Sequence, residues 1–304
     1  MGSNFSSVFC DPCALFCPSP SESSTESSSQ PSIPNLGDLP ENCAALVLGY
    51  LNPQDICNLA RINKAFRSAS WADFVWDSKL PKNFEALVEK ILSGASSDDK
   101  LIRKMGKREV FAFLSQTTVF DEGTKRAWVD KKTGGLCLSI SAKGLTITGI
   151  DDRRYWNHIP TEESRFGSVA YLRQVWWFEV GGNIEFPFPP GKYSILFRIQ
   201  LGRSAKSFGR RICNTEHVHG WGIKPVRFQL STSDGQHISS QSVFEETGKW
   251  ALYHVGDFVV DGRNQMSKIQ VSMAQIDCTH TKGGLCLDSL IVCPCTYEDK
   301  SKVF

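Results

Sequence analysis

Apolar residues return with the period of an α-helix soon after residue 36. One helical stripe, at positions i, i+3, i+4, i+7 and i+8, consists of Cys43, Leu46, Val47, Tyr50 and Leu51. Just before it, Asp38 and Glu41 have the D-x-x-E spacing of a capping box, which satisfies free backbone N–H groups at a helix start. The pattern predicts a first short helix over this stretch.

Two more short helices are predicted directly afterwards. Asn52 is a good N-cap residue, and Pro53 follows at the first helical position. The apolar face of this second helix then continues through Ile56, Leu59, Ala60, Asn63 and Phe66. Ser70 and Asp73 mark a third start, which Leu80-Pro81 ends. Three short helices in about 45 residues cannot bury all their own apolar surface, so this module needs a partner.

Further along the chain, the period of the apolar residues changes from 3.6 residues, as in a helix, to 2 residues, as in a strand. Residues 83–118 predict two more helices that act as a linker, and after about Phe120 alternating runs rich in aromatic and β-branched residues begin. The runs are 126–130, 136–141, 145–150, 175–180, 193–201, 226–231, 253–260, 269–276 and 285–292. Many short strands with no helical pattern between them predict an antiparallel, jelly-roll-like β-sandwich over 119–296. The fold class is therefore multidomain and mainly β.

The N-terminal residues differ from the rest of the chain in charge and in serine content. The 304 residues carry a formal charge of +2, but residues 1–60 contain no Lys or Arg and six acidic residues. Eleven serines fall within the first 32 residues, which predicts a disordered tail over 1–35, and a second short tail is expected at 297–304. The longest apolar stretch is too short to span a bilayer. Eleven cysteines without a secretory signal predict reduced thiols in the cytoplasm and nucleus.

The helical module resembles a known family. Residues 36–67 read L-G-D-L-P-E-N-C-A-A-L-V-L-G-Y-L-N-P-Q-D-I-C-N-L-A-R-I-N-K-A-F-R, and V-W-D-S-K-L-P follows at 75–81. Residues 36–82 are thus similar to an F-box, a module that docks on a Skp1-like adaptor and through it on cullin and RING subunits. The adaptor-binding residues expected are Leu36, Leu39, Pro40, Val47, Leu51, Pro53, Ile56 and Leu59. The alternative is a small helical hairpin packed on its own sandwich.

The sandwich resembles a second family. Its segments L-T-I-T-G-I-D-D-R-R-Y-W, V-W-W-F-E-V-G-G, K-P-V-R-F-Q-L and G-G-L-C-L-D-S-L are similar to the phloem protein 2 domain, a lectin-like β-sandwich. An F-box followed by this domain is the arrangement of the plant F-box PP2-A family. The resemblance implies a non-catalytic substrate-recognition subunit of an SCF-type ubiquitin ligase, whose sandwich binds a target protein or a glycan. The alternative is a carbohydrate-binding lectin module that acts outside a ligase.

Glycan binding requires an aromatic face and polar groups in fixed directions. Trp156 fits the first need, because it lies in a polar, turn-like segment, and hydroxyl partners would come from Asp151, Asp152 and Asn157. The sugar-binding members of the family carry a tryptophan where Gly149 stands, so half of a stacking pair is missing. Trp156 as a core residue is the alternative. Of the neighbours Trp176 and Trp177, one is expected to face the core and the other the surface.

Other chemistry has weaker support in the sequence. Cys and His side chains at Cys213, His217, His219, Cys278 and His280 lack the spacing of a zinc finger, so we expect no metal and no cofactor. An enzyme built on Cys278 or His280 would lack an orienting third group. A set of basic residues, in what we interpret as a solvated loop, comprises Arg203, Lys206, Arg210 and Arg211. With a pI near 8.0, no nucleic-acid partner is expected.

The first residues also carry a candidate lipidation signal. Met1-Gly2 with Ser6 fits the myristoylation pattern at Gly2, and Cys10, Cys13 and Cys17 are candidates for the second acyl anchor. A plain disordered tail is the alternative, since short matches of this kind arise by chance. Membrane contact is therefore expected only if Gly2 is acylated.

Overall fold

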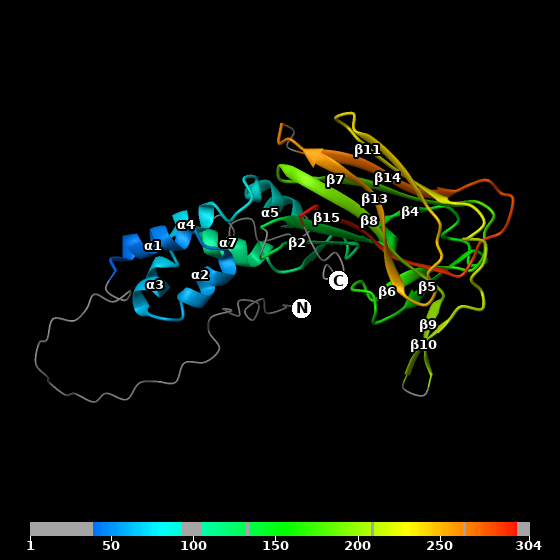
Figure 1. Cartoon of the computed structure of the whole chain (residues 1–304), viewed down its shortest axis with the longest axis horizontal. Helices are drawn as coiled ribbons and strands as arrows, with labels where there is room; N and C mark the ends of the chain where they lie inside the picture. The colour runs from blue at the N-terminus through cyan, green and yellow to red at the C-terminus, as the bar shows by residue number, and fades with distance from the viewer. Residues whose placement is uncertain (1–38, 93–104, 132–133, 208–209, 264–265, 297–304) are drawn as a thin grey trace, which may run out of the picture. The chain divides into compact units, whose positions relative to one another are not determined.

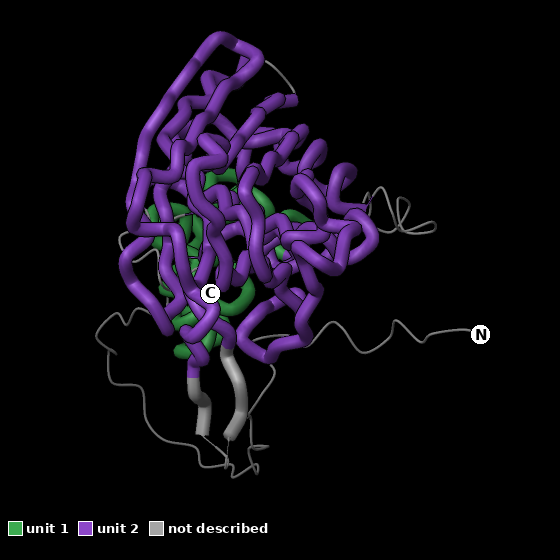
Figure 2. The backbone as a smooth tube through the Cα atoms, turned by 90° about the vertical axis from the view of Figure 1, so that its right-hand side faces the viewer, with its two compact units in different colours: residues 1–80, 106–108 green, residues 81–105, 109–304 purple. Residues whose placement is uncertain are grey.

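The computed structural model describes residues 39–92, 105–131, 134–207, 210–263 and 266–296, without the side chains of 204–212 (Figure 1). The chain divides into two compact units (Figure 2). The first, the helical unit, spans residues 1–80 with 106–108, and the second holds residues 81–105 with 109–304. The predicted class, N-terminal helices followed by a mainly antiparallel β fold, is confirmed.

Between residues 39 and 80 the helical unit contains four short helices, α1 (Glu41–Gly49), α2 (Pro53–Leu59), α3 (Lys64–Ala69) and α4 (Asp73–Asp77). Helix α1 packs against α3 and α4. The buried side chains come from all four helices and include Ala44, Ala45, Leu48, Ile56, Phe66, Ala69, Val75 and Trp76. The indole N–H of Trp76 donates to the backbone oxygen of Ser70 at 2.8 Å, so this buried polar group is satisfied.

Two helix starts have side-chain caps, and three differ from the prediction. Helix α1 starts after Pro40 with no side-chain cap, and Asp38 of the predicted capping box lies outside the described residues. Asn52 caps α2 as predicted, because its side-chain oxygen accepts the N–H of Asp55 at 2.9 Å. The predicted second helix is broken, since Asn63 accepts the N–H of Phe66 and begins α3. The expected cap at Ser70 is wrong: α4 starts after Ala72 with no side-chain cap, and the Ser70 hydroxyl donates to Arg67.

The described part of the stretch predicted as a linker contains two helices. They are α5 (Phe84–Leu92) and α7 (Lys107–Leu114). Helix α5 contacts strand β1, and α7 begins where the Lys107 backbone N–H donates to the carboxylate of Asp73 at 3.0 Å. Both helices bury one apolar face, with Leu87, Val88, Ile91, Val110, Phe111 and Leu114.

The β fold consists of two antiparallel sheets and a hairpin. The eight-stranded sheet contains β1 (Thr118–Phe120), β2 (Lys125–Val129), β3 (Leu136–Ser141), β15 (Leu285–Pro294), β6 (Ser168–Leu172), β5 (Trp156–Pro160), β8 (Gly191–Leu201) and β13 (Trp250–Val260). The five-stranded sheet runs β12 (His237–Ser242), β11 (Val226–Thr232), β14 (Ser267–Gln275), β7 (Phe178–Phe186) and β4 (Thr146–Ile147). Figure 1 shows β11, β14 and β7 side by side.

The core lies between the two sheets. In β7 every second side chain is buried, from Phe178 to Phe186, and the alternation matches the pleat of a strand with one covered face. Aromatic rings link the sheets: Phe197 of β8 and Phe228 of β11 have centroids 6.2 Å apart. Strand β15 is buried along its whole length, because both of its faces are covered.

The segment 161–167 packs on part of the eight-stranded sheet, where Glu163 contacts Arg198 of β8 and Trp250 of β13. Arg198 donates to the backbone oxygen of Glu163 at 3.0 Å and to the carboxylate of Asp288 at 3.0 Å. The guanidinium also lies 4.2 Å above the ring of Trp250, whose N–H donates to the Glu163 carboxylate. A buried ion pair is thus closed in by an aromatic ring and a loop.

Six of the described strands lie where no strand was predicted: β1, β5, β6, β9 (Arg203–Ser207), β10 (Arg210–Asn214) and β12. Strand β5 begins at Trp156, inside the segment interpreted as a turn. The segment with the basic residues, interpreted as a loop, forms the two-stranded hairpin of β9 and β10. Polar composition concealed β5, β9, β10 and β12, because hairpins and sheet edges do not need an apolar alternation.

Candidate functional site

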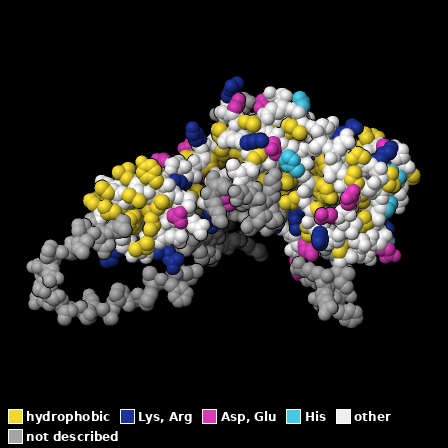
Figure 3. Space-filling model, viewed as in Figure 1, with side chains coloured by type: hydrophobic (Ala, Val, Ile, Leu, Met, Phe, Trp, Pro, Cys, Tyr) yellow, Lys and Arg dark blue, Asp and Glu magenta, His cyan; other side chains and the backbone are white. Residues whose placement is uncertain are grey.

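The first candidate site is an apolar stripe on α1, made of Cys43, Leu46, Val47 and Tyr50. All four side chains are exposed, with Leu46 at 59%, Val47 at 45% and Tyr50 at 90%. They lie at i, i+3, i+4 and i+7, so they share one face of the helix, opposite the buried Ala44, Ala45 and Leu48. Figure 3 shows hydrophobic side chains gathered over the helices of this unit. Contiguous exposed apolar surface of this kind marks a docking site for another protein.

The remaining predicted adaptor-binding residues have different environments. Pro40 is exposed at the start of α1, and Leu39, Leu51 and Leu59 are half-buried. Leu36 lies outside the described residues, as do the lipidation candidates Gly2, Ser6, Cys10, Cys13 and Cys17.

The assignment of Pro53 and Ile56 to the docking surface needs correction. Both side chains are buried, and Ile56 has no exposed surface. A side chain that is already covered by its own chain has no area to lose to a partner, so these residues support the helical unit from inside. The sequence pattern identifies Pro53 and Ile56 as apolar positions, but it does not tell whether they face the core of the unit or a partner.

The predicted sugar-stacking residue Trp156 belongs to the core. It is 2% exposed, and its indole N–H donates to the backbone oxygen of Thr148 at 3.1 Å. Its ring stacks on Phe178 with centroids 6.4 Å apart, and Phe178 meets Trp221 edge to face at 5.0 Å. The glycan-stacking role is therefore wrong for Trp156, because no face of the ring reaches solvent.

The polar residues beside Trp156 form a turn. Asp151 is exposed, and Asp152 and Asn157 are half-buried. The carboxylate of Asp152 accepts two side-chain bonds and the backbone N–H of Arg154, and these bonds lower the pKa of Asp152. Because Trp156 is buried, the four predicted residues lack the aromatic face that the prediction required of Trp156.

Trp176 and Trp177 are the aromatic residues that do reach the surface. Both side chains are exposed, at 56% and 46%, so the prediction that one faces inward is wrong. The strand β7 begins only at Phe178, and the preceding Val175 is held in an isolated bridge with Lys282. The period-2 alternation thus does not extend back to these two residues, which sit in a bend.

A buried ammonium group fixes this bend. Lys282 has no exposed surface, and its Nζ donates to the backbone oxygens of Trp176 at 2.7 Å and Gln275 at 2.9 Å. The carboxylate of Asp277 lies 3.8 Å from the same Nζ. A buried charge is costly unless it is bonded in this way, so Lys282 ties the bend to the end of β14. Sequence gave no signal for it, because lysine is rarely buried.

Cysteine and histidine side chains remain apart in the described part of the chain. There, no three His, Cys, Asp or Glu residues form a group that could hold a metal ion. The ring nitrogens have local partners: His219 Nδ1 lies 2.9 Å from the backbone oxygen of His217, and His280 Nε2 lies 2.9 Å from that of Gly220. Cys213 is half-buried and Cys278 is exposed.

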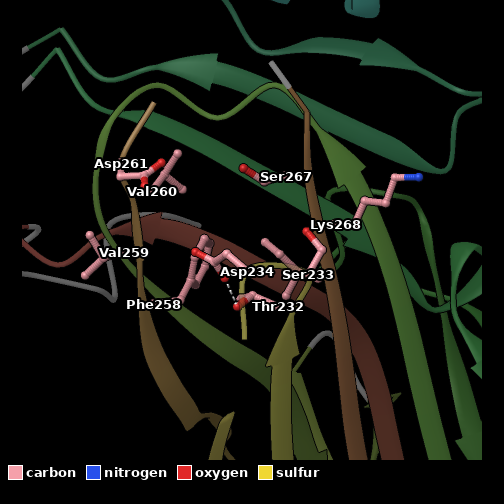
Figure 4. A pocket seen from close by; sticks show the side chains of 10 residues that line it. Thr232, Ser233, Asp234, Phe258, Val259, Val260, Asp261, Ser267 and Lys268 are labelled. Atoms are coloured by element: carbon pink, nitrogen blue, oxygen red, sulfur yellow. Dashed lines mark hydrogen bonds between the residues drawn. The ribbon is translucent and has the colours of Figure 1, made fainter. Parts of the chain in front are cut away.

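A small cavity lies at the turn between β11 and β12 (Figure 4). Its volume is about 20 Å³, with side chains of Thr232, Asp234, Phe258 and Lys268 around it. This is room for about one water molecule and not for a ligand. In the described residues, no helix combines the length and apolar character needed to cross a membrane.

Comparison with known proteins agrees with both halves of the structure. Residues 36–80 match the F-box-like family, and residues 135–294, more than half of the chain, match the family Phloem protein 2. F-box protein PP2-A12 of Arabidopsis thaliana is 61% identical over 272 residues, covering 89% of this chain and 91% of that protein. The chain belongs to the plant F-box PP2-A family. A second relative, F-box protein PP2-A11 of the same plant, is 59% identical and covers 88% of this chain and 91% of its own length.

The F-box PP2-A chain therefore combines a module that implies binding of a Skp1-like adaptor with a phloem protein 2 domain. Solved structures match it less well. A family 35 carbohydrate binding module from Clostridium thermocellum covers 51% of this chain and 96% of its own length, with 8% identity and a TM-score of 0.29. A likeness at that level carries no argument about function.

Proposed function

We infer that this F-box PP2-A chain is a non-catalytic, substrate-recognition subunit of an SCF-type cullin-RING ubiquitin ligase. The observation that carries the proposal is the α1 stripe of Cys43, Leu46, Val47 and Tyr50, which is exposed on an F-box-like unit. A helical unit that leaves this much apolar surface in water gains free energy when another protein covers it. The sandwich then selects the target, a protein or a glycan on it.

The half-buried residues at the ends of the helices extend the proposed docking surface. Pro40 is exposed beside the stripe, while Leu39 and Leu51 are half-buried at the two ends of α1. Anchor side chains at the centre of an interface contribute most of its binding energy, whereas half-exposed neighbours mainly exclude water. We therefore assign Leu46, Val47 and Tyr50 the anchoring role.

The proposed location is the cytoplasm and nucleus. None of the eight cysteines in the described residues forms a disulfide. Cys137, Cys286 and Cys293 are buried in the sandwich, and a reducing compartment keeps such thiols intact. Free thiols and an adaptor-docking surface support the same location.

Calorimetry with a purified Skp1-type adaptor tests the proposal. The variant Val47→Glu places a charge in the centre of the stripe, and we expect its affinity for the adaptor to fall by about 100-fold or more. The matched control Asn58→Glu adds the same charge at an exposed position of α2 and keeps nearly wild-type affinity. Equal unfolding curves for the three proteins show that the charge acts on binding.

Two outcomes would contradict the proposal. In one, the wild-type chain does not bind the adaptor, which leaves the alternative of a carbohydrate-binding module outside a ligase. In the other, Val47→Glu binds as tightly as the wild type, which removes the α1 stripe from the interface.

A further inference from the structure

The outer face of the five-stranded sheet carries side chains in rows that run across the strands. Strand register defines two polar rows, which consist of Ser239, Gln229, Ser272, Gly181 and Thr146, and of His237, Ser231, Gln270 and Asn183. The next row toward the end of β14 is charged, with Arg227 and Glu179 on either side of Ala274. Most of this face is therefore hydrophilic.

An apolar row follows the charged row at the end of the sheet. It consists of the residues that directly follow β12 and β14 or directly precede β11 and β7, and we call it the end row: Val243, Ile276, Pro225 and Trp177. The register of the strand ends, continued by one residue, aligns these four residues on the outer face. All four are exposed, with Val243 at 36%, Ile276 at 45% and Trp177 at 46%.

Two further apolar side chains lie beside the end row on a fixed backbone. Trp176 and Ile223 are 56% and 65% exposed. The backbone oxygen of Trp176 accepts the buried ammonium of Lys282, and the buried amide of Gln275 donates to the backbone oxygen of Lys224 at 2.6 Å. A contiguous apolar patch with a polar surround marks a protein interaction site, and a fixed backbone reduces the ordering cost of binding.

The spacing of the end row matches a helix better than an extended chain. Neighbouring strands lie about 4.8 Å apart, so the four positions span about 15 Å. Side chains on one face of an α-helix recur about every 5–6 Å along its axis, whereas those on one face of an extended segment recur about every 6.6 Å. A helix of about 10 residues that lies across the strands can thus place one side chain against each strand end.

The charged row gives the partner a preferred sign of charge. Arg227 is exposed, and among the described residues it has no ion pair or hydrogen bond. Glu179 in the same row accepts the indole N–H of Trp177 at 3.0 Å, and Lys224 at the end of the sheet pairs with Asp277 at 2.7 Å. The positive charge of Arg227 therefore favours an acidic residue beside the apolar face of the partner.

The size of the patch argues against a second copy of the chain as the partner. A stable interface of standard size uses about 20–30 residues on each side. The end row with Trp176 and Ile223 supplies six, in a narrow band bounded by the charged row. A few large side chains, with tryptophans among them, are enough to anchor one helix.

We propose that the end row, together with Trp176 and Ile223, binds the apolar face of an amphipathic α-helix in the target protein, and that an acidic residue of this helix contacts Arg227. The inference rests on the proposed function in one respect, because it takes the sandwich as the part that selects the target. It identifies the recognised feature of the target as a helix of the polypeptide.

Selection from a display library of helical peptides tests the proposal. Each probe is a 16-residue alanine-based helix with varied apolar residues at i, i+3, i+4 and i+7, and with Glu, Gln or Lys at the flanking positions. We expect the full wild-type chain to enrich helices that carry Glu. In anisotropy titrations of an enriched peptide, Trp177→Ser and Ile276→Ser are each expected to weaken binding about tenfold or more.

A charge exchange tests the contact with Arg227. We expect Arg227→Glu to weaken binding of the Glu-bearing peptide about threefold to tenfold, and replacement of that Glu by Lys in the peptide to restore the affinity. A structural role of Arg227 would not produce this recovery. Exposed groups change in all three protein variants, so their unfolding curves are expected to match that of the wild type.

Matched controls separate the patch from apolar surface in general. Val119→Ser removes a side chain that is 49% exposed on β1, close to the exposure of Ile276. Gln270→Ala changes one of the polar rows on the same face of the sheet. Both variants are expected to bind the enriched peptide as the wild type does.

Four results would overturn the proposal. They are no enrichment of helices by the wild type over Trp177→Ser, enriched peptides with apolar residues only at i and i+2, binding that Arg227→Glu leaves unchanged, and a wild-type dimer in sedimentation that Ile276→Ser dissociates. Adaptor binding, measured on the same samples, is independent of all four. A failure of this surface and a failure of the ligase proposal are therefore distinguishable.

Discussion

The α1 stripe and the polar rows of the five-stranded sheet are both open to solvent, but their chemistry is opposite. The stripe presents Leu46, Val47 and Tyr50, and the polar rows present amides and hydroxyl groups such as those of Gln229 and Gln270. Water solvates the second surface well and the first one poorly. The first surface is thus stable only when covered by protein, whereas the second is stable in contact with water.

The difference follows from the size of the two cores. Four short helices bury a few apolar side chains and have too little volume to cover the rest. The sandwich closes a large aromatic core between its sheets, and the segment 161–167 packs over the buried pair Arg198 and Asp288. A self-sufficient core lets most of the outer face of the five-stranded sheet stay polar.

The largest expected effect is a loss of stability when the buried Trp156 is replaced, compared with the exposed Trp177. Trp156→Ala empties space beside Phe178 and should lower the free energy of unfolding of the sandwich by about 3–5 kcal/mol. Trp177→Ala removes an exposed ring and should change it by less than about 0.5 kcal/mol. Urea unfolding followed by circular dichroism measures both. Equal losses in the two variants would mean that Trp177 is structural and not a surface residue that can contact a partner.

A second pair of variants sharpens the division inside the helical unit. Ile56→Ala creates a cavity in a small core and should lower the free energy of unfolding by about 2–4 kcal/mol. Val47→Ala shortens an exposed side chain and should cost less than about 0.5 kcal/mol. Thermal unfolding of the full chain, with the helical signal followed at 222 nm, gives both values. An Ile56→Ala protein as stable as the wild type would contradict the placement of Ile56 in the core and would support the original prediction that it contacts the adaptor.

The smallest expected effect is a pH dependence of the stability of the sandwich, caused by Asp257. Partial burial raises the pKa of Asp257, but hydrogen bonds from Ser194, His254 and Lys192 outweigh it and lower the pKa to about 2. A carboxylate with a lowered pKa stabilises the fold fully above its ordinary value of about 3.9. That stabilisation is lost as pH falls from about 4 to about 2. Since Asp257 keeps contact with solvent, screening makes the contribution small.

Unfolding curves at pH 2 to 5 check this dependence. Asp257→Asn should lose stability at pH 5 but change less than the wild type between pH 4 and pH 2. Asp261→Asn, an exposed aspartate after the same strand, serves as the control. If wild type and Asp257→Asn show the same slope, another group controls the acid sensitivity of the sandwich.

Much of the fold was predictable because long strands and capped helices have local signals. The period-2 run of β14 and the Asn52 cap of α2 are examples, since each depends only on neighbouring residues. The break between α2 and α3 and the start of β5 at Trp156 were not predicted. The break is marked by a local signal that the prediction missed, the cap of Asn63 on Phe66, whereas β5 is held by its pairing with β6.

The candidate sites were predicted only in part, for a related reason. The stripe at Cys43, Leu46, Val47 and Tyr50 is visible in sequence, but whether it faces core or solvent depends on the neighbouring helices. Trp156, which was expected at the surface, is buried against Phe178, and both Trp176 and Trp177 are exposed although one of them was expected in the core. The polar rows join five strands that are distant in sequence, so only the strand register reveals them.

Hydrogen–deuterium exchange of the full chain with and without a Skp1-type adaptor tests the central claim, that the α1 stripe is the adaptor-binding surface, most directly. Amides that a partner covers exchange more slowly, and the position of the slowed amides identifies the interface. The account predicts slower exchange in peptides spanning residues 39–52 and no change in β7, β11 and β14. Unchanged exchange over 39–52 together with slower exchange in those strands would contradict it.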